Sequence, residues 1–236
     1  WLLAAELRSI GIDLSFAPCI DLDYGVSEVI GDRAYHRDPE VVSRLAVACM
    51  QGMRTAGMAA TAKHFPGHGA VVADSHKALP VDRRPLTELT DELLPYRRMI
   101  ANGLTSVMVA HVLFPEVDAA PAGFSARWIQ QELRWGLGFT GAVFSDDLSM
   151  GGAAFAGTVP ERARRAIEAG CDLLPICNDR PAVLATLTEL EGAADPLSQV
   201  RLVRLHGRPM PAREQLRKMA QWAECQRAID HCREAP

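Results

Sequence analysis

Short, continuously apolar runs alternate with helix-like segments along most of this chain, and that alternation restricts its fold more than any other feature. Strands that are apolar throughout, rather than at every second residue, are covered on both faces. This pattern is typical of a parallel sheet flanked by helices. Proline lacks the N–H that a sheet ladder needs, so Pro175 is unfavourable in the last run. The five predicted strands cover residues 14–18, 58–62, 105–110, 141–144 and 172–176.

Capping residues mark the ends of several helices. Asp38 followed by Pro39 predicts a helix start, because the aspartate accepts hydrogen bonds from the first free amides and proline fits the first turn. Thr158 with Glu161 predicts another start, and Gly170 predicts the end of that helix. Further helices are predicted over residues 1–9, 92–102, 125–133, 181–190 and 213–232.

The order of elements favours a (β/α)8 barrel of the TIM type over its competitor, a flavodoxin-like sheet of five strands. A barrel needs about three more βα units before Trp1, and Trp1 lies inside an amphipathic helix. We therefore expect the first three units to be missing from this sequence. Residues 1–196 are predicted to form a partial barrel, and residues 197–236 a helical extension that packs on it.

The densest group of titratable side chains follows the second predicted strand. Lys63, His64, His68, Asp74 and His76 fall within fourteen residues, separated by a proline, glycines and other small residues. Active sites of α/β proteins lie at the C-terminal ends of parallel strands, so this loop is the leading candidate site. Its lysine and first histidine can donate hydrogen bonds to sugar hydroxyls, a carboxylate or a phosphate.

Two further patterns point to acid and base chemistry. Asp74 and His76 are two residues apart in an extended loop, so the carboxylate can accept a hydrogen bond from the imidazole and fix its tautomer. Such a histidine suits proton transfer. Asp146 directly follows the fourth predicted strand and could be a nucleophile, a metal ligand or a helix cap. Asp147 is an alternative carboxylate that the sequence pattern does not distinguish from it.

A metal site is the competing interpretation of the histidines. His64, His68, His76 and Asp74 together offer enough ligands for zinc. The spacing of the first two resembles metal-binding pairs on helices, but the intervening proline and glycine exclude a helix there. We therefore predict no metal.

Charge and cysteine usage exclude other classes of function. The net charge is −4, which argues against binding to nucleic acid or to an anionic membrane. The sequence contains no apolar run long enough for a transmembrane helix. None of the six cysteines forms a CxxC pair, and free thiols in a reducing compartment are expected.

Several segments together resemble the bacterial β-N-acetylhexosaminidases of glycoside hydrolase family 3. They occur in the order of that family and extend over residues 1–178, and the loop motif is the most specific of them. The matching segments are Lys63-His64-Phe65-Pro66-Gly67-His68-Gly69, Asp74-Ser75-His76, residues 79–82, 11–18, 29–34 and 121–125, and Phe144-Ser145-Asp146-Asp147 with the three residues that follow.

The resemblance implies a (β/α)8 barrel and a retaining mechanism. By the family pattern Asp146 is the nucleophile and forms a covalent glycosyl-enzyme intermediate. His76 is the general acid and base, paired with Asp74, in place of the second carboxylate of most glycosidases. The positions that bind the sugar are Arg33, Lys63 and His64.

The substrate implied by the resemblance is a terminal, non-reducing, β-linked N-acetylglucosamine on peptidoglycan fragments (anhydromuropeptides) from cell-wall recycling. This implies a cytoplasmic, monomeric enzyme without metal or cofactor, whose partner is a small carbohydrate or muropeptide. Another family 3 β-glycosidase, a metal-dependent hydrolase and a non-catalytic sugar-binding remnant are the alternatives. We expect the 236 residues alone to be weakly active or inactive.

Overall fold

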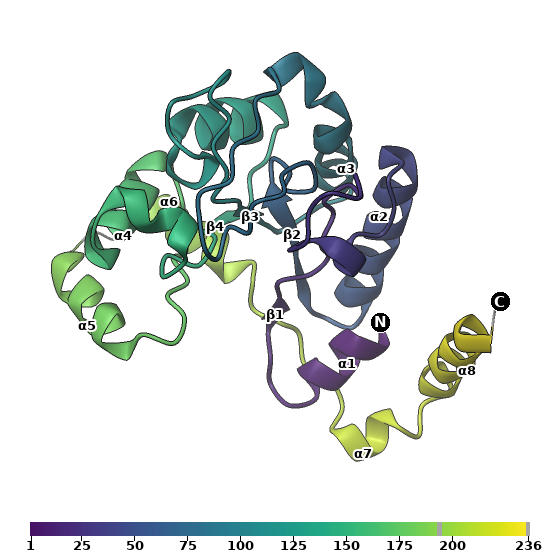
Figure 1. The fold of residues 1–236 in the computed structure, drawn as a ribbon. Helices are drawn as coiled ribbons and strands as arrows, with labels where there is room; N and C mark the ends of the chain where they lie inside the picture. Colours follow the sequence, from purple (N-terminus) through teal and green to yellow (C-terminus); the bar gives the residue numbers. More distant parts are fainter. Residues whose placement is uncertain (193–194, 235–236) are drawn as a thin grey trace.

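A four-stranded parallel sheet forms the centre of the computed structural model, which describes residues 1–192 and 195–234. Its order is β1-β2-β3-β4, so neighbours in the sheet are also neighbours in the chain (Figure 1). The predicted parallel α/β arrangement is therefore confirmed. The strands are β1 (Leu14–Ser15), β2 (Ala59–Phe65), β3 (Ser106–Val109) and β4 (Ala142–Ser145).

The helices begin where their capping residues predicted. Asp38 Oδ1 accepts from Glu40 N, and Thr158 forms a reciprocal capping box with Glu161. Gly170 ends α4 in the left-handed conformation, which glycine adopts without steric conflict. The helices are α1 (Leu2–Arg8), α2 (Pro39–Thr55), α3 (Thr90–Ala101), the π-helix η4 (Arg127–Gly136), α4 (Val159–Ala169), α5 (Arg180–Glu189), α6 (Pro196–Val203), α7 (Arg213–Leu216) and α8 (Ala220–Glu234).

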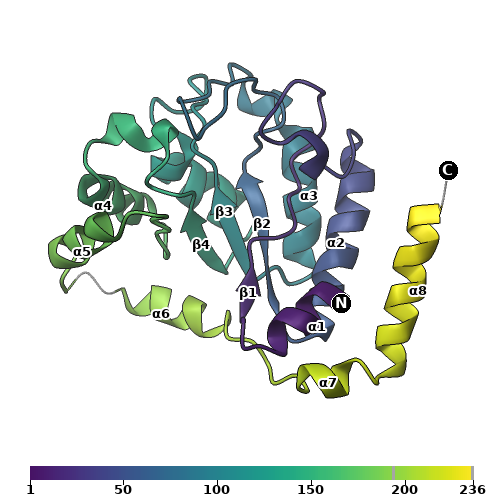
Figure 2. The ribbon, with the colours of Figure 1, turned by 60° about the horizontal axis from the view of Figure 1, so that its bottom comes forward.

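The main hydrophobic core lies between the sheet and the helices on one of its sides. Helices α2 and α3 pack against each other there (Figures 1 and 2). Phe65 at the end of β2 contacts Tyr96 and Trp128 edge to face, with ring centroids 5.1 and 6.0 Å apart. These contacts anchor the end of β2, from which the candidate site begins.

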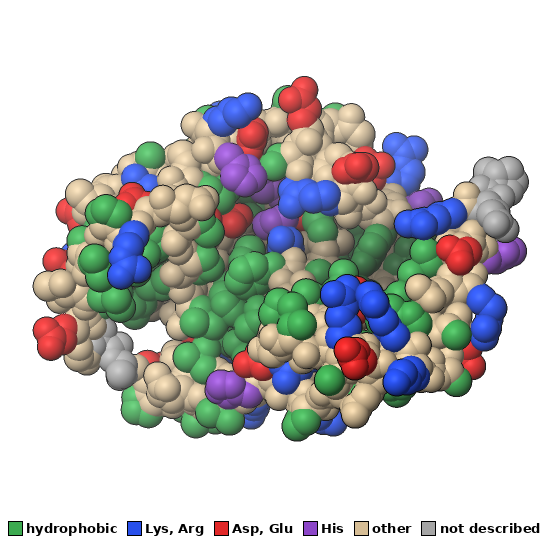
Figure 3. Space-filling model, turned by 90° about the horizontal axis from the view of Figure 1, so that it is seen from below, with side chains coloured by type: hydrophobic (Ala, Val, Ile, Leu, Met, Phe, Trp, Pro, Cys, Tyr) green, Lys and Arg blue, Asp and Glu red, His purple; other side chains and the backbone are tan. Residues whose placement is uncertain are grey.

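The opposite side of the sheet carries a smaller apolar cluster that includes Ala59, Met108 and Phe144. Phe16 lies edge to face against Phe144, with ring centroids 5.2 Å apart, yet it is 41% exposed. Figure 3 shows hydrophobic side chains gathered in a hollow of the molecular surface. This side of the sheet is thus less completely covered than the other.

The fifth predicted strand, over residues 172–176, was wrong. The segment makes only an isolated bridge between Leu173 and Phe144, with Leu173 N donating to Val143 O at 3.1 Å. Pro175 has no N–H to continue the ladder, and its carbonyl instead accepts from Leu148 N.

The single helix predicted over residues 213–232 is two helices, α7 and α8. Leu216 and Trp222 are buried, and most of α8 beyond its first turn is exposed (Figure 2). In residues 1–192 and 195–234, no helix has the length and apolar character needed to cross a membrane.

Candidate active site

The candidate site lies at the C-terminal ends of the strands. Cys19, which follows β1, forms a parallel bridge with Lys63 near the end of β2. Asp146 follows β4, and its N–H donates to the carbonyl of Val109 at the end of β3, at 3.1 Å. Residues that are far apart in the sequence therefore meet at the C-terminal end of the sheet, as expected for parallel strands.

Asp21 is the centre of the buried part of the site. Its Oδ2 accepts hydrogen bonds from His64 N at 3.1 Å and from His64 Nδ1 at 2.8 Å, and its Oδ1 accepts from His68 N at 2.7 Å. The thiol of Cys19 donates to Oδ2 at 3.2 Å. Burial raises the pKa of this carboxyl, but the two histidines and the thiol outweigh it, so the pKa lies below its usual value. A buried carboxylate thus fixes the backbone and one side chain of the histidine loop.

Lys63 and Arg33 bring positive charge to the same place. Burial lowers the pKa of the Lys63 ammonium, while the negative charges of Asp146 and Asp21 act in the opposite direction. Arg33 lies in the short helix η1 (Gly31–Arg33), is exposed, and donates from Nε to Val29 O at 3.0 Å. Its positive charge also acts to lower the pKa of Lys63. The site therefore combines donors with a nearby carboxylate.

The side chains of Asp74 and His76 are hydrogen-bonded in the manner expected from their spacing. Asp74 Oδ1 accepts from His76 N at 2.9 Å and lies 2.7 Å from His76 Nδ1. The backbone and imidazole N–H groups of His76 hold the pKa of Asp74 below its usual value. The His76 side chain is 60% exposed and that of Asp74 29%, so the pair is open to solvent. This arrangement leaves Nε2 of His76 as the ring nitrogen that can exchange a proton.

The structure separates Asp146 from Asp147, which the sequence did not. The carboxylate of Asp147 accepts from Ser149 N at 2.9 Å and from Cys177 N at 3.1 Å, so it stabilises a turn and holds a second loop. Among the described residues, the carboxylate of Asp146 accepts one hydrogen bond, from Asp147 N at 2.9 Å. Asp146 is therefore the carboxylate with capacity for further chemistry.

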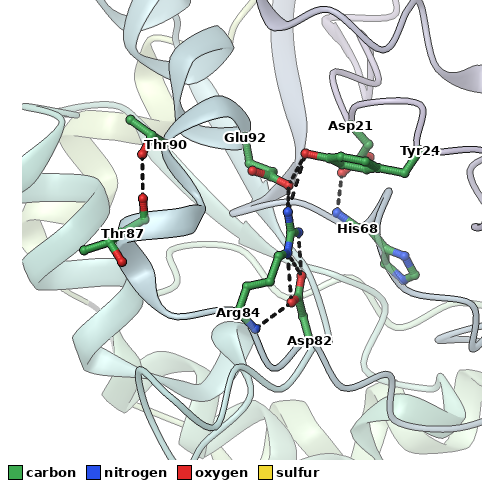
Figure 4. Close-up of polar contacts among 8 residues, drawn as sticks. All are labelled: Asp21, Tyr24, His68, Asp82, Arg84, Thr87, Thr90 and Glu92. Atoms are coloured by element: carbon green, nitrogen blue, oxygen red, sulfur yellow. Dashed lines mark hydrogen bonds and ion pairs between the residues drawn. The ribbon is translucent and has the colours of Figure 1, made fainter.

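A network of charged side chains lies next to the segment that carries Asp21 (Figure 4). Arg84 pairs with Asp82 at 2.6 Å and also with Glu92, and the hydroxyl of Tyr24 donates to Glu92 at 2.6 Å. Both carboxylates are buried. The network joins the loop that carries Asp21 to the start of α3 and so fixes the distance between them.

The glycines of the loop motif are required by close approaches. A Cβ on Gly69 would lie 1.9 Å from the carbonyl oxygen of Leu22, and a Cβ on Gly67 would lie 2.8 Å from Cγ of Glu92. A side chain at Gly69 would push the histidine loop away from the Asp21 segment, and one at Gly67 would displace the side chain of Glu92 in α3. The motif is therefore partly a packing requirement.

The four residues of the competing metal interpretation, His64, His68, Asp74 and His76, do not form a group of mutually close ligands among the described residues. Within residues 1–192 and 195–234, the one group of potential ligands with mutually close atoms is Cys19, Asp21 and His64. His68 instead lies with Nε2 at 2.9 Å from Ser75 Oγ. Burial is the main cause that raises the pKa of the Cys19 thiol, to about 12, which keeps it protonated at neutral pH and makes it a poor ligand.

A family model described as the glycosyl hydrolase family 3 N-terminal domain matches residues 1–203. The chain belongs to glycosyl hydrolase family 3. The family resemblance predicted from the sequence is confirmed. The family 3 chain is 50% identical, over its whole length, to the beta-hexosaminidase of Thioalkalivibrio sulfidiphilus, and it covers 68% of that relative. It is 53% identical to the beta-hexosaminidase of Thiobacillus denitrificans over 95% of its own length, covering 63% of that protein.

Solved structures of the family agree with this assignment. NagZ from Neisseria gonorrhoeae, in complex with N-trifluoroacetyl-D-glucosamine, is 43% identical with a TM-score of 0.85. The match covers 96% of this family 3 chain and 66% of the NagZ chain. The β-N-acetylglucosaminidase of Thermotoga maritima is 30% identical with a TM-score of 0.71, over 86% of this chain and 44% of that one. The chain thus spans about two thirds of the length of its beta-hexosaminidase relatives.

Sequence reasoning missed the buried residues that organise the family 3 site. Asp21 was assigned no role from the sequence, and the only role considered for His68 was that of a metal ligand. His111, whose Nε2 lies 3.2 Å from Asp147 O, is fully buried beneath the segment that carries Asp146. The available signal was position, because Asp21 and His111 each lie just beyond a predicted strand.

Proposed function

We propose that this protein is a retaining exo-β-N-acetylglucosaminidase. The observation that carries the proposal is an exposed His76–Asp74 dyad whose loop is hydrogen-bonded to the segment that follows Asp146, a strand-end carboxylate. Relatives named beta-hexosaminidase, and a NagZ structure with an N-acylated glucosamine analogue, support this activity. A glycosidase needs one group to attack the anomeric carbon and one to move a proton, and the site offers both.

The reaction would proceed in two steps. Asp146 attacks the anomeric carbon while His76 gives its Nε2 proton to the leaving oxygen, so the glycosidic bond breaks as a glycosyl ester forms. His76 then takes a proton from water, which attacks the same carbon and releases Asp146. Asp74 accepts from Nδ1 in both steps and stabilises the imidazolium.

The sugar would be held by cationic and neutral donors. Lys63 and Arg33 suit the hydroxyls and the acyl oxygen of N-acetylglucosamine. His64 donates through Nδ1 to Asp21, which leaves its Nε2 to accept from a sugar hydroxyl. No step in this mechanism uses a metal or cofactor.

We further propose that the chain is part of a (β/α)8 barrel that lacks its first three βα units, with residues 1–196 in the barrel and 197–236 as an extension. Two observations support this: β1 is an edge strand, and the apolar cluster on the less covered side of the sheet is small and partly exposed. This chain covers 68% and 63% of two beta-hexosaminidase relatives, which therefore have room for these units. The natural substrate is proposed to be peptidoglycan fragments with terminal N-acetylglucosamine, cleaved in the cytoplasm by a monomer.

The test is hydrolysis of a chromogenic β-N-acetylglucosaminide. Two versions are compared: the 236-residue chain, and a completed chain with the N-terminal third of the Thioalkalivibrio relative placed before Trp1. The completed chain is expected to be active, the shorter one weakly active or inactive, and Asp146→Ala is expected to abolish activity. A β-glucoside is the specificity control, and a chelator is expected to have no effect.

Three results would overturn the proposal. Activity on the β-glucoside alone would indicate another family 3 β-glycosidase. Binding of N-acetylglucosamine by a folded completed chain without hydrolysis would indicate a sugar-binding remnant. Loss of activity with the chelator would restore the metal-dependent alternative.

A further inference from the structure

Ser75, which lies between Asp74 and His76 in the sequence, points into the protein. Ser75 is 2% exposed, whereas the side chains of Asp74 and His76 face solvent. Ser75 Oγ lies 2.9 Å from Nε2 of His68, and the backbone N–H of His68 donates to Asp21. His68 therefore connects the buried carboxylate of Asp21 to Ser75, the residue between Asp74 and His76.

Burial lowers the pKa of His68 and keeps its imidazole neutral, with a single ring proton. In the part of the chain that the structure describes, Nδ1 of this ring is buried without a hydrogen-bond partner. An orphaned N–H is less tolerable than an orphaned lone pair, so the proton belongs on Nε2, where it is donated to Ser75. A neutral link of this kind fixes geometry without adding charge beside the dyad.

The backbone of the same loop is held from a second side. Gly151 N donates to His76 O at 3.0 Å, and Gly152 N donates to Ser75 O at 2.9 Å. A Cβ on Gly152 would lie 2.8 Å from the Ser75 carbonyl, and one on Gly151 would lie 2.6 Å from Lys77 O. Both glycines belong to η5 (Gly151–Ala156), which begins five residues after Asp146. The loop is thus fastened both to Asp21 and to the segment that follows the nucleophile.

We propose that Ser75, His68 and Gly152 are positioning residues that hold the His76–Asp74 dyad in register with Asp146. The inference rests on the proposed function, since it assigns these residues to the acid and base steps of that reaction. None of the three touches the sugar in this scheme. They act by limiting the positions from which Nε2 of His76 can reach the leaving oxygen, and a small displacement of a proton donor slows its step strongly.

The kinetic test compares substrates that do and do not need an acid. In the completed chain, Ser75→Ala and Gly152→Ala are expected to lower kcat/KM for an N-acetylglucosaminyl disaccharide by about tenfold to a hundredfold. The second substrate is a dinitrophenyl β-N-acetylglucosaminide, whose leaving group departs without protonation. For it, kcat/KM is expected to fall by no more than about threefold. A purely structural role would reduce both substrates alike, and that result would overturn the proposal.

Matched variants separate positioning from general destabilisation. Ser43→Ala removes an equally buried serine hydroxyl, which donates to Pro39 O at 2.6 Å in α2, and should leave the ratio of the two rates unchanged. His68→Gln retains an N–H near the position of Nε2 and should preserve more disaccharide activity than His68→Leu. Equal losses in these two would contradict the hydrogen-bond link.

A readout independent of activity is trypsin cleavage after Lys77, whose side chain is 83% exposed. In the 236-residue chain, Ser75→Ala should be cut there several-fold faster than Ser43→Ala, because its loop opens more readily. Equal rates would overturn the anchoring. If the wild type hydrolyses neither substrate, the proposed function fails, and the cleavage rates still decide whether the loop is held as inferred.

Discussion

The site has an inner half and an outer half that are built in different ways. The inner half, Asp21 with His64 and His68, is buried, and the carboxylate at its centre is saturated with hydrogen bonds. The outer half, Asp74 with His76, is exposed and held mainly through its own backbone. A group that must exchange protons needs solvent, whereas a group that fixes a loop does so best where water cannot compete. The two halves should therefore respond differently to substitution.

The largest effect is expected for Asp21→Ala. The change leaves two backbone N–H groups and the His64 ring without their buried acceptor, and the free energy of unfolding should fall by about 3–5 kcal/mol. Urea denaturation measures this loss. The control is Asp23→Ala, an exposed carboxylate two residues away, for which a change within about 1 kcal/mol is expected. Equal losses of stability in Asp21→Ala and Asp23→Ala would show that the buried carboxylate does not hold the inner half together.

An intermediate effect is expected from pH. Burial is the main cause that lowers the pKa of His68 and of His111, so both bind protons more readily when unfolded. Their contribution to stability is complete above the unfolded pKa of about 6.5 and decreases as pH falls from there toward the folded values. Each can contribute a slope of at most about 1.4 kcal/mol per pH unit.

Thermal unfolding between pH 7.5 and pH 5 tests this expectation. The unfolding temperature should decrease over that range in the wild type, and less steeply in His111→Gln, which cannot titrate at that position. A wild-type stability that is flat or rises as pH falls would show that the buried histidines are not neutral.

The smallest effect on stability is expected in the outer half. His76→Ala removes an exposed ring, so the unfolding temperature should stay within about 2 °C of the wild type. In the completed chain the same variant should retain cleavage of activated aryl glycosides and lose cleavage of the disaccharide. A large fall in the unfolding temperature would mean that the outer half also stabilises the fold, contrary to the difference proposed between the two halves.

Local signals were enough to predict much of the fold. Asp38 and Thr158 cap helices through contacts within three residues, which a sequence displays directly. The segment over 172–176 misled the prediction because its apolar content outweighed the effect of Pro175. Whether the four strands belong to a closed barrel is not decided by contacts between residues close in sequence, so no local pattern could establish it.

Sequence separation also distinguishes the site contacts that were predicted from those that were missed. The Asp74–His76 contact spans two residues and was visible from spacing, whereas the Asp21–His64 contact spans 43. The link between His68 and Ser75 spans seven residues of irregular loop, where no period predicts which side chains turn inward. Local pairs are readable in a sequence, but buried centres that join distant segments become visible only once the strands are in register.

The order of the strands has a consequence for folding during translation. Each strand pairs with the one made just before it, so a chain leaving the ribosome meets an existing partner every time a new strand emerges. The sheet can grow by addition at a single edge, without waiting for a distant segment to be translated. The histidine loop is synthesised before Asp146 and η5, so its second point of attachment becomes available only after β4 has emerged.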